Sequence, residues 1–186
     1  FDWDLIKKLA LHNENYSINI IGDYKNLTEL ISTLPKNIHF LGLKKQIELP
    51  NYLKYTDYSL IPFKTGEIGD FVSPLKIFEY ISMYTKVLST TLPDIKGYPN
   101  LYCGNTSEEW INIVEKNYEV NKFDADNFID NNSWHSRVTE IINNIYKEKN
   151  NSILSGKLSI IILNYNNKNI IFKSLNSLIK YNELYN

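Results

Sequence analysis

The sequence has one cysteine, few glycines and no long apolar run, and each of these absences excludes a class of protein or site. One of its 186 residues is a cysteine, Cys103, which excludes an intramolecular disulfide and a multi-cysteine metal site. Its seven glycines form neither the GxGxxG nor the P-loop fingerprint, so the common nucleotide-binding motifs are missing. The longest strongly apolar run, LSIIIL, is far shorter than the about 20 residues that span a bilayer.

The chain also lacks an excess of charge of either sign. Its 20 basic and 21 acidic residues leave a net charge of -1, which argues against nucleic acid as a partner and against a strongly basic membrane-binding face. The histidines, His12, His39 and His135, are far apart and have no metal-site spacing, which favours surface or packing roles over metal binding. With 43% hydrophobic residues and no signal-peptide pattern, the sequence indicates a globular protein of the cytoplasm.

Short apolar strands alternate with helical patterns through the first 150 residues. This order predicts an α/β fold, a Rossmann-like parallel sheet with helices on both faces. The predicted strands are 16–23, 37–42, 58–63, 86–90 and 100–104, and the predicted helices are 2–12, 26–34, 49–57, 73–84, 107–119 and 132–149. The first helix has apolar residues near helical spacing, at Trp3, Ile6, Leu9 and Leu11, and the last has Trp134, Val138, Ile141, Ile142 and Ile145 on one side.

The pattern divides the chain into three segments. Residues 1–148 form the first domain, and 149–156, a polar stretch with glycine and serine, read as a linker. Residues 157–186 predict a single strand and helix, too little to bury a core alone. Because the chain opens inside a helix pattern and closes on another, we expect it to be part of a longer protein, truncated at both ends.

Ligands of open parallel sheets bind beyond the carboxyl ends of the strands. This rule selects four connections as candidate binding loops. They are Gly22–Asp23, 41–43, 62–70 and 90–94.

The segment SPLKIFEY, residues 73–80, predicts the start of a helix at this edge. Ser73 is the expected N-cap and Pro74 the first helical residue. Lys76 and Glu79 are three residues apart, which permits two interpretations. They form a solvated surface pair, or Lys76 and the helix N-terminus bind phosphate while Glu79 accepts hydrogen bonds from ribose hydroxyls.

The run SPLKIFEYISMYTKVLSTTLPDIKGYPNLYCG resembles the nucleotide-sugar-binding segment of GT-B glycosyltransferases of family four. Upstream, INIIGD and NIHFLGLKKQIELPNYLKYTDYSLIPF are similar to the strand series of that family, and downstream NSWHSRVTEI is similar to its C-terminal helix. The resemblance covers about residues 1–148 and implies the C-terminal, donor-binding half of a GT-B fold.

This resemblance implies roles for individual positions. Glu79 would bind the donor ribose, 74–76 would lie near the diphosphate, 42–44 near the base and 64–71 near the sugar. Many members have a glutamate where this chain has Phe71, with Glu67 and Asp70 as candidate substitutes. Lys76 and Glu79 are the expected catalytic residues, and the implied donor-binding set is Gly22, Asp23, Gly42, Leu43, Lys44, Gly66, Glu67, Asp70, Ser73, Pro74, Leu75, Lys76 and Glu79.

The tail has a resemblance of its own. LSIIILNYNNKNIIFKSLNSLI is similar to the first strand and helix of family-two glycosyltransferases of the GT-A fold, in which Asn164, Tyr165 and Asn166 would contact the nucleotide. A buried hydrophobic strand explains SIIIL equally well.

The two resemblances together imply a bacterial glycosyltransferase of surface polysaccharide synthesis. The donor would be a nucleotide diphosphate sugar, with UDP, GDP and dTDP undecided, and no cofactor or metal. The acceptor, a glycan or a lipid-linked sugar, would bind a missing N-terminal domain, so the isolated chain should bind nucleotide without turnover, in the cytoplasm or at the inner membrane face. The alternatives are a non-catalytic nucleotide- or partner-binding domain, and a GT-B-fold epimerase or phosphorylase.

Overall fold

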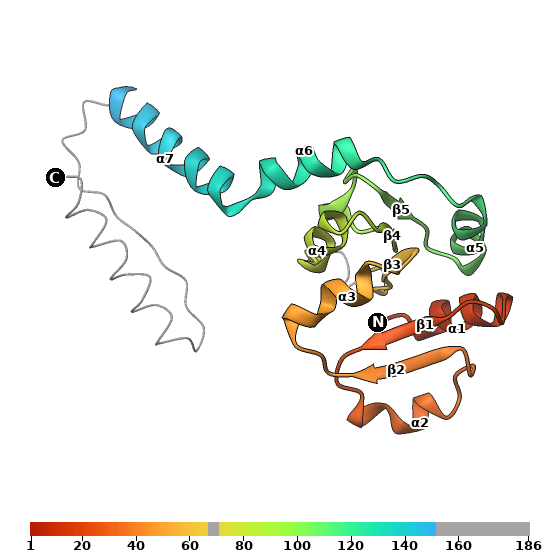
Figure 1. Ribbon diagram of the computed structural model, residues 1–186. Helices are drawn as coiled ribbons and strands as arrows, with labels where there is room; N and C mark the ends of the chain where they lie inside the picture. The colour runs from red at the N-terminus through yellow and green to blue at the C-terminus, as the bar shows by residue number, and fades with distance from the viewer. Residues whose placement is uncertain (67–70, 152–186) are drawn as a thin grey trace. The chain divides into compact units, whose positions relative to one another are not determined.

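The computed structural model describes residues 1–66 and 71–151 (Figure 1). The chain divides into two compact units, Phe1–Ile141 and Ile142–Asn186. The core and the candidate site lie in the first unit. Residues 152–156 of the predicted linker and the predicted strand and helix of 157–186 lie outside the described residues.

The first half of unit 1 contains two parallel strands. In chain order it comprises α1 (Trp3–His12), β1 (Ile18–Ile21), η1 (Lys25–Leu27), α2 (Thr28–Ile31) and β2 (Ile38–Gly42). β1 and β2 pair in parallel with Ile18 opposite Ile38, and the register shifts before Ile21, which lies opposite Gly42. The arrows of both strands therefore point the same way in Figure 1.

α1 is helical as predicted, and Ile6 and Leu9 of its apolar spacing are buried. Asp2 caps it by accepting a hydrogen bond from the backbone N–H of Leu5 at 3.0 Å. Leu5, Ile6, Leu9 and Ala10 are buried, whereas Leu11 is 62% exposed. Successive helical residues are about 100° apart, which turns Leu11 away from the stripe that Leu5 and Leu9 define.

The second half of unit 1 contains a three-stranded parallel sheet. Its strands are β3 (Tyr58–Ile61), β4 (Lys86–Ser89) and β5 (Leu101–Cys103), in the order β3-β4-β5. The elements between and after them are η2 (Gln46–Glu48), α3 (Leu49–Leu53), α4 (Lys76–Ser82), η4 (Pro93–Ile95), α5 (Ser107–Lys116), α6 (Lys122–Asn132) and α7 (Trp134–Asn151).

β4 is the central strand, and all four of its residues are buried. Leu88 belongs to a cluster with the buried residues of α1, β1, β2 and Trp110 of α5. Val87, one residue earlier, belongs to a second cluster with Ile77 and Ile81 of α4 and Ala125 of α6. Because successive strand residues point to opposite faces, helices cover the sheet on both sides. The structure thus confirms the predicted Rossmann-like α/β architecture.

α6 is absent from the predicted elements, because NKFDADNFIDNN is rich in the asparagine and aspartate of turns. Its first turn is capped by Asn121, whose Oδ1 accepts from the backbone N–H of Asp124 at 3.0 Å. Ala125, Phe128 and Ile129 pack into the second cluster. Their i, i+3, i+4 spacing is the signal that could have identified this helix.

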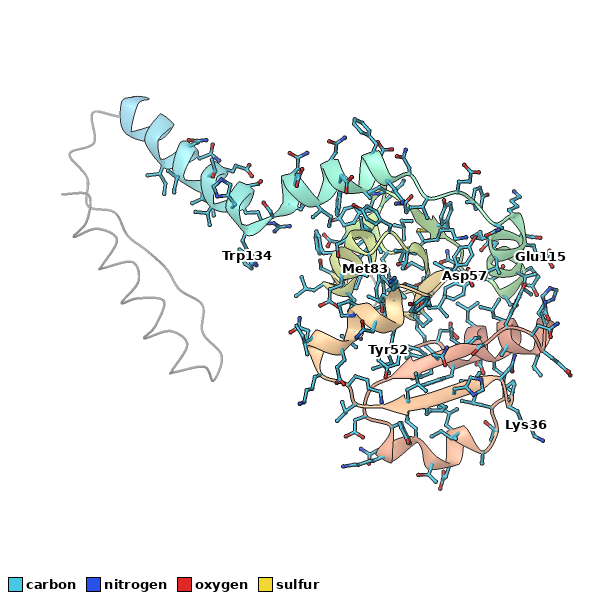
Figure 2. All side chains as sticks on the ribbon, in the orientation of Figure 1. Lys36, Tyr52, Asp57, Met83, Glu115 and Trp134 are labelled. Atoms are coloured by element: carbon cyan, nitrogen blue, oxygen red, sulfur yellow. The ribbon has the colours of Figure 1, made fainter. Side chains whose placement is uncertain are left out.

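α7 is helical as predicted, yet much of its apolar side is exposed. Trp134 is 84% exposed at the start of the helix (Figure 2), and Val138 and Ile141 are also exposed. In the described part of the chain, no helix is both long enough and apolar enough to cross a membrane.

Candidate functional site

The carboxyl ends of β1 and β2 meet, as the parallel pairing requires. The backbone N–H of Gly22 donates to the carbonyl of Gly42 at 3.1 Å, which brings the predicted residues Gly22, Asp23, Gly42 and Leu43 to one edge. Gly42 has a φ of 73°, a conformation that glycine adopts without strain. Asp23 also has a local role, since its Oδ1 accepts from the backbone N–H of Lys25 at 3.1 Å.

The connection after β2 carries a basic and an aromatic side chain together. The Nζ of Lys44 lies 5.9 Å from the centre of the Tyr52 ring, within the range of a cation–π contact. Next to Lys44, Leu43 is exposed. The residues expected to border a base are thus at the surface of the edge, with Lys44 held against α3.

α4 begins later than the sequence predicted. Ser73 was the expected N-cap, but the cap position is Leu75, no side chain caps the helix, and its seven residues begin at Lys76. The carbonyl of buried Pro74 accepts from the backbone N–H of Ile77 at 3.0 Å, and that of Leu75 accepts from Phe78 at 3.2 Å. These i+3 bonds form a tight turn before the helix, which leaves the Ser73 hydroxyl without a capping role.

Lys76 and Glu79 do not form the surface pair that one interpretation proposed. Within residues 1–66 and 71–151, one ion pair has its charged atoms within 4 Å, and it joins His12 to Glu115 at 2.9 Å. Glu79, which is half-buried, accepts instead from the amide Nε2 of Gln46 at 3.4 Å. Lys76 is exposed and makes no side-chain hydrogen bond within the described chain.

Gln46 was not predicted as a site residue. It starts η2, the turn after β2, which is held by a hydrogen bond from the backbone N–H of Lys45 to Glu48 Oε2 at 2.8 Å. Its contact with Glu79 therefore links the connection after β2 to α4. Since 33 residues separate the two in sequence, no local pattern could have identified the pair.

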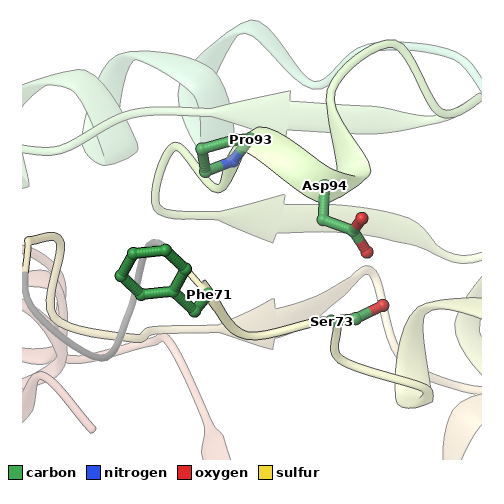
Figure 3. Close-up of a pocket in the computed structure, with 4 residues that line it drawn as sticks. All are labelled: Phe71, Ser73, Pro93 and Asp94. Atoms are coloured by element: carbon green, nitrogen blue, oxygen red, sulfur yellow. The ribbon is translucent and has the colours of Figure 1, made fainter.

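An open pocket of about 430 Å³ lies between the connections that follow β3 and β4. Figure 3 shows Phe71 and Ser73 on one segment and Pro93 and Asp94 on the segment that faces it. The two strands are neighbours, with Ile61 opposite Ser89 at their carboxyl ends. The pocket thus occupies the edge that the rule for parallel sheets selects. Of the predicted residues Ser73 lines it, Gly66 ends the preceding described segment, and Glu67 and Asp70 lie outside the described residues.

The ionisable side chains of the described part of this edge include Lys76, Glu79 and Asp94. Within the described residues, no three histidine, cysteine, aspartate or glutamate side chains come together as metal ligands. Tyr80 follows Glu79, and burial, with a smaller contribution from the Glu79 charge, raises the pKa of its phenol. Tyr80 therefore stays neutral at physiological pH, and it adds no charge next to Glu79.

No family model matches the chain. The chain is similar to a protein of Bacillus subtilis (strain 168) described as "Putative teichuronic acid biosynthesis glycosyltransferase TuaH". The two are 31% identical over 97 residues, which is 50% of this chain. The chain spans about a quarter (24%) of the length of that relative.

Proposed function

We propose that the chain is the donor-binding part of a glycosyltransferase, of the GT-B type, and that its ligand is a nucleotide diphosphate sugar. The observation that carries this proposal is the separation of Lys76 from Glu79. Neither charge is neutralised by the other, and Glu79 is instead oriented by Gln46. The similarity to a protein described as a glycosyltransferase of teichuronic acid biosynthesis supports the same class.

In the proposed complex Glu79 binds the ribose of the donor. A carboxylate accepts hydrogen bonds only, and the two hydroxyls of a ribose are donors, so the two groups are complementary. Gln46 donates to Glu79 Oε1 at 3.4 Å and favours one orientation of the carboxylate. Oε2 accepts no hydrogen bond from a side chain of the described residues, so in the proposed complex it is available to the ribose hydroxyls.

Lys76 supplies the positive charge for the diphosphate. α4 has seven residues and no side-chain cap, so we assign the charge to the ammonium group rather than to the helix terminus. When the glycosidic bond to the donor breaks, negative charge grows on the departing diphosphate, and a fixed cation stabilises it. Removing a single group with this role from an enzyme typically lowers kcat by about 100- to 1000-fold.

The remaining elements of the reaction belong to the proposed whole protein. The acceptor would be a glycan or lipid-linked sugar of a surface polysaccharide, bound by a further domain. The site needs no metal or other cofactor for the roles given to Lys76 and Glu79. A second, GT-A-like transferase unit beginning near residue 157 would add a further sugar.

The test is nucleotide binding by the 186-residue chain, measured by calorimetry with UDP, GDP and dTDP. We expect one nucleotide to bind and Glu79→Ala to weaken it about tenfold or more, as loss of a hydrogen bond to a charged group predicts. Lys76→Ala should weaken binding and reduce its dependence on salt. Gln46→Leu should have a smaller effect, because it removes the orientation of Glu79 and not its charge.

Glu119→Ala is the matched control, since Glu119 is exposed in the connection between α5 and α6. It should bind nucleotide as the parent chain does. A folded chain that binds none of the three nucleotides, or a Glu79→Ala variant with unchanged affinity, would overturn the proposal.

A further inference from the structure

β1 and β3 are neighbouring edge strands of two separate sheets. In the described part of the chain, β1 pairs with β2 and β3 pairs with β4, each in parallel. The strand orders are β2-β1 and β3-β4-β5, and no register of hydrogen bonds joins β1 to β3 within the described residues. The open edge of a strand presents backbone N–H and C=O groups that can pair with a further strand.

The open edges of β1 and β3 lie over one hydrophobic core. Ile18 of β1 belongs to the same cluster as Leu88 of β4, and Ile20 of β1 and Leu60 of β3 pack against that cluster. Figure 1 shows β1 on the side of β2 that faces β3, with the N-terminus between β1 and β3. The two sheets are thus parts of one layer, and the two open edges face each other within it.

α1 runs along this layer in the direction of a crossover helix. Its start lies at the carboxyl end of β3, because the backbone N–H of Asp2 donates to the carbonyl of Pro62 at 2.7 Å. Its end lies at the amino end of β2, because Asn37 Nδ2 donates to the carbonyls of Ala10 at 2.9 Å and Asn13 at 3.3 Å. A helix with this direction returns the chain from the carboxyl end of one parallel strand to the amino end of the next. The strand after α1 is β1, and the described residues include none before it.

The open edge of β3 already accepts one backbone hydrogen bond. The backbone N–H of Thr90 donates to the carbonyl of Ile61 at 3.2 Å, so the backbone groups of Ile61 point to β4. Backbone groups of successive strand residues point to opposite edges, so those of Leu60 and Pro62 point to the open edge. The bond from Asp2 to Pro62 therefore has the position of the last rung of a parallel ladder along β3.

The same alternation applies to β1. The backbone N–H of Ile18 donates to the carbonyl of Asn37 at 2.9 Å, on the side of β2. The N–H of Asn19 therefore points to the open edge of β1, as the N–H of Leu60 points to that of β3. A single strand between the two edges would accept hydrogen bonds from both amides.

We infer that a further strand lies between β1 and β3 in a longer protein, parallel to both, and that the segment directly ahead of Phe1 supplies it. The sheet then has the order of a doubly wound fold, in which the first strand lies between the second and the fourth. A central strand of a parallel sheet is covered on both faces, so the segment should be a short run rich in valine, isoleucine and leucine. The similar protein described above extends well beyond the 24% of its length that this chain spans. The inference does not depend on the proposed function.

Hydrogen exchange resolved by residue with NMR tests the open edges, in the 186-residue chain and in a chain with a strand added. The added probe is a six-residue segment rich in valine and isoleucine, placed directly ahead of Phe1. In the parent chain, we expect the protection factors of the Asn19 and Leu60 amides to be about tenfold or more below those of Ile18 and Ile61, which face paired edges. The added segment should raise protection at Asn19 and Leu60 by about tenfold or more.

The matched control carries the same segment with prolines at its central positions, because proline has no N–H for a ladder. It should leave protection at Asn19 and Leu60 within about twofold of the parent. An added segment that leaves both amides unprotected would overturn the inference, since the edges would not accept a strand. Protection of both amides in the parent would overturn it as well. The edges would then already be paired, with the predicted strand of 157–186 or, where protection rises with protein concentration, with a second copy.

Discussion

Two neighbouring hydroxyls at the end of β4 have different environments. Ser89 Oγ lies 3.2 Å from the carbonyl of Ile61 and 2.8 Å from that of Thr90, so it has acceptors for its proton. Thr90 is 2% exposed, and its Oγ1 has no hydrogen-bond partner in the described chain. A buried hydroxyl without a partner costs about 1–3 kcal/mol of stability.

Thr90→Val should therefore stabilise the protein. The two side chains have nearly the same shape, and valine removes the hydroxyl that has no partner. We expect the free energy of unfolding to rise by about 1 kcal/mol, measured by urea unfolding at neutral pH. Ser89→Ala is the control next to it and should lower the same quantity by about 1 kcal/mol. A lower stability in Thr90→Val would show that its hydroxyl is satisfied in solution.

At the residue scale, the sequence predicted the edge of the sheet but not all of the side chains that gather there. The rule for parallel strands selected the connections containing Gly22, Gly42 and Asp94, and Ser73 was identified separately, as the expected start of a helix. It could not show that Glu79 would contact Gln46, because that contact depends on how η2 packs beside α4. Local spacing favoured an ion pair between Lys76 and Glu79, but Glu79 contacts Gln46 instead.

At the scale of single elements, the start of α5 shows how one carboxylate can hold a helix terminus. Thr106 Oγ1 accepts from the backbone N–H of Glu109 at 3.2 Å. Glu109 Oε2 in turn accepts from the backbone N–H groups of Asn105 at 2.6 Å and Thr106 at 3.1 Å. These backbone donors lower the pKa of Glu109 from its ordinary value, because they favour the ionised form.

The capping carboxylate should make stability depend on pH. A carboxyl whose pKa is lower in the folded than in the unfolded state stabilises the fold above the unfolded value, about 4.3 for glutamate. That stabilisation is lost as the pH falls through the folded pKa. We expect the free energy of unfolding to decrease less steeply below about pH 5 in Glu109→Gln than in the parent, measured by urea unfolding across the acid range. Glu119→Gln should follow the parent, and identical curves for Glu109→Gln would contradict the capping role.

Element boundaries were predictable where capping residues and apolar spacing agree, and not elsewhere. α5 has Thr106 and Glu109 in the order of a capping box and was predicted to start at Ser107, where it does start. α4 has a serine and a proline in the order of a helix start, yet it begins at Lys76 because the Pro74 and Leu75 carbonyls form i+3 bonds first. Side-chain type alone does not distinguish these hydrogen-bonding patterns.

At the scale of the whole molecule, the sequence showed which face of a helix is apolar but not what covers it. The stripe that begins at Trp134 on α7 was predicted from spacing, and α7 is helical as expected. Trp134, Val138 and Ile141 are nevertheless exposed, whereas the Leu5 and Leu9 stripe of α1 is buried. Whether an apolar stripe is buried depends on which helices and strands pack against it. That packing is a property of the folded unit and not of the local sequence.

The position of β4 between the two hydrophobic clusters has a consequence for amide hydrogen exchange. β4 pairs with β3 and β5, and Leu88 and Val87 each anchor a different cluster. We expect the amides of β4 to exchange slowest. The amides of α1 and α4 should share one free energy of opening, because opening either cluster exposes the shared strand. Leu88→Ala should lower the protection of backbone amides against exchange in α4 as well as in α1, measured by hydrogen exchange with mass spectrometry. Loss confined to α1 would mean that the clusters open independently.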